Sequence, residues 1–209
     1  MKDKIAEYCR STYDVQILLL IGSRATGMAR QGSDWDLITF VNELPESSTV
    51  HEKFGDELLD IVFIKLPVSP QFIIDTAWSP VPAVEVLQDQ KGLGAAIAKR
   101  TEAAYQKGPS PLGAKEIKTK HLRLERFTQK VLNAPTRSEA FYYLAFIYSN
   151  MITQIWFQLQ GEWPQPIYQA LETIKKRDLK LYTALEELTD PEQQTKVLKN
   201  LPSILFQTK

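Results

Sequence analysis

The segment Val15–Ile21 constrains the fold most strongly, because it is rich in branched apolar residues and ends at Gly22-Ser23. An apolar run that stops at a turn signal is typical of a strand buried on both faces. Similar patterns predict strands at Trp35–Val41 and Leu58–Leu66, with a possible edge strand at Ala83–Leu87. We therefore expect a small mixed sheet with flanking helices on one side, in a chain of the α+β class.

The segment Gly108–Gly113 divides the chain into two parts of different character. It holds two prolines and two glycines, which is typical of a linker. Strands and helices alternate before it, and only helical patterns follow it. We therefore expect a domain at residues 1–107 and a helical bundle at 114–209. The expected helices cover 2–12, 24–30, a stretch from Ser69-Pro70 to before Ser79, 92–105, 115–133, 138–160, 166–176, 180–188 and a last one from Asp190-Pro191.

Composition excludes several classes of protein. The 25 Lys and Arg residues balance 25 Asp and Glu residues, which argues against a protein that coats duplex DNA through its phosphates. The single Cys9 cannot form an internal disulfide, and together with an N-terminus that does not resemble a signal peptide it favours a cytoplasmic location. The most apolar stretch, Ala140–Ile147, is shorter than the ~20 residues of a membrane span, so we expect a buried helix there.

Gly22 and Ser23 predict a phosphate site at the end of the first strand. Backbone N–H groups and a hydroxyl at the start of a helix bind anions well, and a glycine lets a phosphate approach the backbone closely. Arg24 or Arg30 would add positive charge. The alternative is a plain turn, which the acidic residues that follow make less favourable.

Asp34, Asp36 and Asp60 predict a metal site. Asp34 and Asp36 lie two positions apart at the start of a strand and therefore share one face, while Asp60 lies inside another apolar strand. Carboxylates in such surroundings are costly unless a cation joins them. Mg²⁺ prefers carboxylate and phosphate oxygens together, so neighbouring strands would let these three acids hold two Mg²⁺ ions, or Mn²⁺, beside a triphosphate. The alternative is an exposed edge strand with solvated acids.

These motifs resemble those of the nucleotidyltransferases related to DNA polymerase beta, in particular small bacterial members similar to kanamycin nucleotidyltransferase. The resemblance covers about 15–92 and rests on eight matching positions, namely Gly22, Ser23, Ala25, Gly27, Ser33, Asp34, Asp36 and Leu37, with Asp60 as the third acid. Thr26 stands where an arginine is common in the family.

The resemblance implies an enzyme that moves a nucleoside monophosphate from an Mg²⁺-bound NTP, with ATP expected, to a hydroxyl of an aminoglycoside-like acceptor. Asp34, Asp36 and Asp60 would be the catalytic, metal-binding residues. Gly22, Ser23, Arg24 and Ser33 would bind the nucleotide. Three alternatives remain: a toxin–antitoxin type enzyme that modifies protein or RNA, an inactive nucleotide-binding module, and a structural protein that dimerises through its bundle. A homodimer is also possible for the enzyme.

The helical half carries weaker signals. Five basic residues gather on one face of the helix expected at 115–133, and they indicate either a solvated surface or a positive wall facing an anionic substrate: Lys115, Lys118, Arg123, Arg126 and Lys130. Glu125 is a candidate general base, although a single acid on a helix is more typical of a surface residue. His51 and His121 lack a second ligand nearby in the sequence, so we expect both to be structural or exposed.

Overall fold

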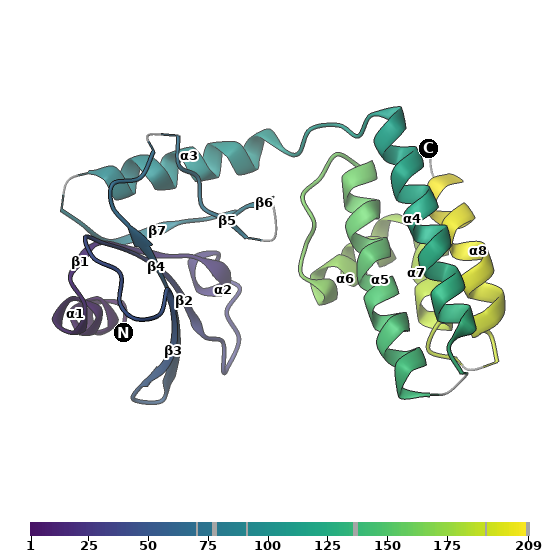
Figure 1. Cartoon of the computed structure of the whole chain (residues 1–209), viewed down its shortest axis with the longest axis horizontal. Coiled ribbons are helices and arrows are strands. Elements are labelled where there is room, and N and C mark those ends of the chain that lie inside the picture. The colour runs from purple at the N-terminus through teal and green to yellow at the C-terminus, as the bar shows by residue number, and fades with distance from the viewer. Residues whose placement is uncertain (70, 77–78, 91, 136–137, 191, 208–209) are drawn as a thin grey trace. The chain divides into compact units, whose positions relative to one another are not determined.

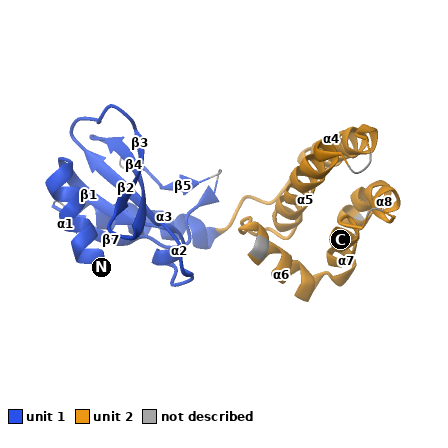
Figure 2. Ribbon diagram, turned by 90° about the horizontal axis from the view of Figure 1, so that it is seen from below, with its two compact units in different colours: residues 1–107 blue, residues 108–209 orange. Residues whose placement is uncertain are grey.

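A computed structural model describes residues 1–69, 71–76, 79–90, 92–135, 138–190 and 192–207. The chain divides into two compact units, Met1–Lys107 and Gly108–Lys209, which Figure 2 shows in different colours.

The first unit is built on a five-stranded mixed sheet with the order β3-β4-β2-β1-β7 (Figure 1). These strands are β1 (Val15–Leu20), β2 (Trp35–Val41), β3 (Thr49–Phe54), β4 (Glu57–Lys65) and β7 (Glu85–Asp89). Strands β2 and β4 pair in parallel, and the other neighbours pair antiparallel. The mixed α+β architecture expected from the sequence is therefore confirmed.

Helices cover both faces of this sheet, so the expectation of helices on one side was wrong. Leu18 and Leu20 of β1 pack in one core with α1 (Lys2–Thr12). Ile17 and Leu19 pack in another core with α3 (Leu93–Lys107). Because side chains alternate along a strand, the unbroken apolar run from Ile17 to Leu20 requires cover on both faces.

Two further elements of the first unit differ from the expectations. Strand β3 was not predicted, because its polar residues alternate with half-buried ones at the edge of the sheet. The helix expected after Ser69-Pro70 was also wrong: residues 71–76 are not helical, and a small second sheet pairs β5 (Asp75–Thr76) with β6 (Ser79–Pro80). Pro70 itself and residues 77–78 lie outside the described residues. The predicted short helix at 24–30 is the single turn α2 (Gly22–Ala25).

The second unit consists of five helices in the described ranges: α4 (Ala114–Asn133), α5 (Glu139–Leu159), α6 (Ile167–Arg177), α7 (Leu179–Glu187) and α8 (Gln194–Gln207). One apolar core joins them, with Tyr148 and Phe157 of α5 fully buried in it. The predicted cap of α5 is confirmed, since the Ser138 hydroxyl oxygen accepts a hydrogen bond from the Phe141 N–H. Pro191, expected near the start of α8, lies outside the described residues. In the part of the chain that is described, no helix is both long and apolar enough to cross a membrane.

Candidate active site

Strands β2 and β4 bring two of the three predicted acids side by side. Asp36 and Asp60 are directly paired in the parallel register of these strands. Both lie on the sheet face that holds Ile38 and Phe40, whereas Trp35 lies in the opposite core and is buried. The expectation that Trp35 points away from the acids and packs in the core is therefore confirmed.

Asp34 completes the acidic group just before β2. Its side chain is exposed, while Asp36 is half-buried. Burial, followed by the negative charges of Asp34 and Asp60, raises the pKa of the Asp36 carboxyl from 3.8 to about 6. The ionised Asp36 carboxylate is therefore disfavoured by its burial and by its two acidic neighbours, and a cation placed beside it would offset that cost.

Gly22 lies directly against Asp36. Its φ of +71° favours glycine, and a Cβ at this position would overlap the Asp36 carboxylate, with the Cγ atom 2.7 Å away. The residue before Gly22 also contacts Asp36, because the Ile21 N–H donates to the Asp36 carbonyl oxygen at 2.9 Å. The glycine–serine turn and the acid pair therefore form one continuous site.

The Ser23 hydroxyl lies in this turn and forms no hydrogen bond with the residues of the described ranges. In contrast, the Thr26 hydroxyl is engaged, since it donates to the carbonyl oxygens of Gly22 and Ser23 at 3.2 and 3.1 Å. Thr26 thus stabilises the turn through its backbone carbonyl oxygens, and the Ser23 hydroxyl keeps its donor available within the described ranges.

Arg24 holds the loop that leads to the acids. Its Nε donates to the carbonyl oxygens of Ser33 and Asp34, and Nη2 forms an ion pair with Glu57 at 2.7 Å. The guanidinium also lies 4.3 Å from the centre of the Trp35 ring, whose Nε1 donates to Glu57. These contacts give Arg24 a structural role that the sequence did not suggest; its nucleotide-binding role stays a prediction.

Ser33 also stabilises this loop, because its hydroxyl oxygen accepts a hydrogen bond from the Arg30 N–H at 2.9 Å. Its nucleotide-binding role likewise stays a prediction.

His51 lies beside Asp60, a contact that the sequence patterns did not predict. It pairs with Asp60 across β3 and β4, and its Nδ1 lies 3.3 Å from the Asp60 Oδ1. The signal was present in the sequence: a two-residue Gly55-Asp56 turn joins Phe54 to Glu57, and counting back from that pair places His51 opposite Asp60. The expectation that His51 has no second ligand nearby was wrong.

The three acids suit divalent cations by their chemistry, although they do not form a ready-made metal centre. Within the described ranges, no group of three or more His, Cys, Asp or Glu side chains is gathered closely enough to hold an ion. Three observations nevertheless fit Mg²⁺: the donors are hard carboxylate oxygens, the Asp60 Oδ1 is buried without an aligned hydrogen bond, and Gly22 keeps the space beside Asp36 free of a Cβ. A pocket of about 310 Å³ lies beside Asp34 and Asp60.

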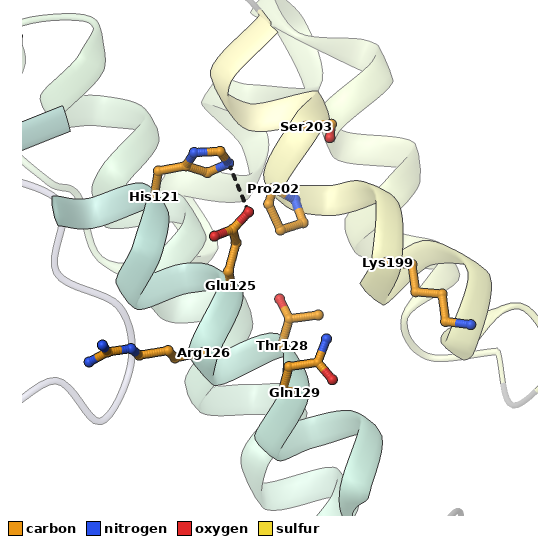
Figure 3. Close-up of a pocket in the computed structure, with 8 residues that line it drawn as sticks. All are labelled: His121, Glu125, Arg126, Thr128, Gln129, Lys199, Pro202 and Ser203. Atoms are coloured by element: carbon orange, nitrogen blue, oxygen red, sulfur yellow. Dashed lines mark ion pairs between the residues drawn. The ribbon is translucent and has the colours of Figure 1, made fainter. Parts of the chain in front are cut away.

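Glu125, the candidate general base, lines a separate pocket within the helical unit. Figure 3 shows this pocket between α4 and α8, with the Glu125 carboxylate directed toward His121. The His121 Nε2 lies 3.8 Å from the Glu125 Oε1, and the imidazole packs on Phe206 with ring centres 4.7 Å apart. The pocket has a volume of about 470 Å³. The role of Glu125 as a base stays a prediction.

Comparison with known proteins identifies the domain that carries the acids. A search of curated proteins found no match for this chain. The family described as "Polymerase beta, Nucleotidyltransferase" matches residues 3–80, a range that includes the glycine–serine turn and all three acids. The segment that holds the turn and the acids is therefore similar to the nucleotidyltransferase domains of the DNA polymerase beta superfamily.

Proposed function

We propose that this protein transfers a nucleoside monophosphate from an Mg²⁺-bound NTP, with ATP expected, to a hydroxyl group of an acceptor. The observation that carries the proposal is the contact between Gly22 and Asp36, because it joins the turn suited to phosphate with the acids suited to metal. In the reaction a bond forms between the acceptor oxygen and the α-phosphorus. The bond from that phosphorus to the β-phosphate oxygen breaks, pyrophosphate leaves, and the hydroxyl proton passes to solvent.

Asp34, Asp36 and Asp60 would hold two divalent cations, which supply neutralisation of the triphosphate and a lower pKa for the acceptor hydroxyl. The chain's own contribution is to place the substrates. Ser23 would donate its free hydroxyl to a phosphate oxygen, and Gly22 would let the phosphate approach the backbone. Because both acids of the β2–β4 pair are fixed on neighbouring strands, they need little rearrangement when the nucleotide binds.

The proposed acceptor is a small molecule with hydroxyl groups, and the aminoglycoside type is the first candidate on the resemblance to kanamycin nucleotidyltransferase. One observation favours a second candidate, an RNA end. Five basic side chains of α4 are exposed, and none forms an ion pair within the described ranges: Lys115, Lys118, Arg123, Arg126 and Lys130. A positive helix face suits an anionic acceptor better than a polycationic aminoglycoside.

The test is incubation of the full chain with each α-labelled NTP, Mg²⁺ or Mn²⁺, and a panel of aminoglycosides, RNAs and cell extract. We expect one acceptor to gain the label while pyrophosphate is released. Asp36→Asn should abolish the transfer, and Glu46→Gln, which changes an exposed acid outside the site, should retain it. No labelled product with any nucleotide, or full transfer by Asp36→Asn, would contradict the proposal.

A further inference from the structure

His51 is the polar neighbour of a carboxylate oxygen that is otherwise isolated. The Asp60 Oδ1 is buried and forms no aligned hydrogen bond with the described residues. The only ion pair that Asp60 forms within those ranges is with His51, over 3.3 Å from Nδ1 to Oδ1. The remainder of the imidazole faces solvent, with 73% of the side chain exposed.

The register of β3 and β4 places His51 beside Asp60. His51 and Asp60 are directly opposite on antiparallel strands, and the tight turn at Gly55, which has a φ of +63°, fixes that register. Directly opposite residues have their Cβ atoms about 5 Å apart, so the pairing of β3 and β4 keeps the imidazole within reach of the carboxylate. The backbone therefore keeps the two side chains adjacent, and their rotamers bring Nδ1 and Oδ1 to 3.3 Å.

A buried carboxylate oxygen without a donor is costly, and a ring N–H is the donor that the structure offers it. Carboxylates that bind metal ions are commonly held by a second hydrogen bond of this kind, which fixes the orientation of the ligand. The Nδ1 atom, 3.3 Å from Oδ1, is close enough to donate once the exposed ring is oriented toward the carboxylate.

We propose that His51 is a positioning residue for Asp60: its Nδ1–H holds Oδ1 and thereby leaves Oδ2 to the divalent cation. This inference rests on the proposed function, in which Asp60 is a metal ligand. It assigns His51 the Nδ1–H tautomer, whereas free neutral imidazole side chains favour Nε2–H.

The tautomer can be read directly by NMR of the full chain without metal or substrate. The chain has only two histidines, so the ring ¹⁵N signals are few, and His51→Gln assigns them. At pH 8 we expect a protonated Nδ1 in His51. His121 is the internal comparison, because its Nε2 faces Glu125 and should carry the proton instead. A wild-type His51 with an unprotonated Nδ1 would overturn the proposal.

Asp60→Ala is the matching variant, and it should return His51 to the Nε2–H form. The Trp35 Nε1–H signal reports whether the first unit still folds, because this group donates to Glu57 and does not touch His51. If the Trp35 signal is retained and His51 keeps a protonated Nδ1 without the carboxylate, the assigned contact is wrong. If the Trp35 signal is lost, Asp60→Val is used with the same readout, because valine suits a strand and also removes the acceptor oxygens.

Electron paramagnetic resonance of Mn²⁺ binding tests whether His51 affects the affinity of the site for a divalent cation. We expect His51→Ala to weaken binding about tenfold, which is typical for loss of a residue that orients a metal ligand. His51→Asn should recover part of the loss, since its amide can donate near the position of Nδ1, and His121→Ala should bind as wild type. Equal affinity of His51→Ala and wild type would overturn the inference. If the wild type binds no Mn²⁺, the proposed function fails as well, while the tautomer still reports on the His51–Asp60 contact.

Discussion

Replacement of Asp36 by Asn should stabilise the metal-free protein while abolishing its activity. Burial, together with the charges of Asp34 and Asp60, raises the pKa of Asp36 from 3.8 to about 6. At pH 7.5 the ionised carboxylate therefore opposes folding. An increase of this size corresponds to roughly 3 kcal/mol. Because Asp36 is only half-buried, water screens part of the repulsion, and we expect a gain of about 1 kcal/mol for Asp36→Asn.

The sign of the pH dependence follows from the raised pKa. Below about pH 4 the carboxyl is protonated in both the folded and the unfolded chain, so it costs nothing. Between about pH 4 and 6 the unfolded chain has lost this proton while the folded chain retains it, and the contribution of Asp36 to stability falls as the pH rises. Above pH 6 the full cost is present. The difference between Asp36→Asn and wild type should therefore be near zero at pH 4 and largest above pH 6.

Urea unfolding of both proteins in EDTA, at pH 4.5 and 7.5, measures this difference. A gain of about 1 kcal/mol at pH 7.5 raises the Tm of a unit of ~100 residues by about 4 °C. Glu46→Gln, an exposed acid outside the site, is the control and should leave the stability unchanged at both pH values. An Asp36→Asn variant that is no more stable than wild type at pH 7.5 would contradict a destabilising Asp36 carboxylate.

Three further predictions concern the turn and its support. Gly22→Ala should lose the transfer activity and at least ~2 kcal/mol of stability on urea unfolding, because its Cβ would displace the Asp36 carboxylate. Gly27→Ala is the control: its φ of +74° is similar, but the space around it is open, so it should lose only about 1 kcal/mol. Ser23→Ala should leave the Tm unchanged and raise the KM for NTP about tenfold in steady-state kinetics, since one hydrogen bond to a charged phosphate is lost; an unchanged KM would exclude a phosphate contact. Arg24→Lys should lower the free energy of unfolding by about 1–2 kcal/mol, because lysine keeps the charge but cannot reproduce the several guanidinium contacts; a variant as stable as wild type would contradict the role of Arg24 in holding the loop.

The parts of the fold that could be predicted are those in which a pattern within one short segment determines the secondary structure. The apolar run of β1 and the helical spacing of α1 predicted these elements, because the pattern of apolar residues within each segment shows which side chains must be buried. The same holds for the acids: two carboxylates two positions apart, and a third inside an apolar strand, are costly without a shared cation.

Other features depend on contacts between distant segments. The helix expected after Ser69-Pro70 fails because Ile74 is buried against α3, where its N–H donates to the Thr101 hydroxyl oxygen. The role of Arg24 depends on Glu57, which is thirty-three positions away in the sequence. The pairing of His51 with Asp60 was predictable in principle, but only after the hairpin turn had been recognised from Gly55.

The most direct test of the account is a crystal structure with Mn²⁺ and a non-hydrolysable NTP. We expect anomalous density for Mn²⁺ at the carboxylates of Asp36 and Asp60, and phosphate oxygens beside Gly22 and Ser23. A nucleotide that binds away from this turn, or that binds here with no metal between the two acids, would contradict it.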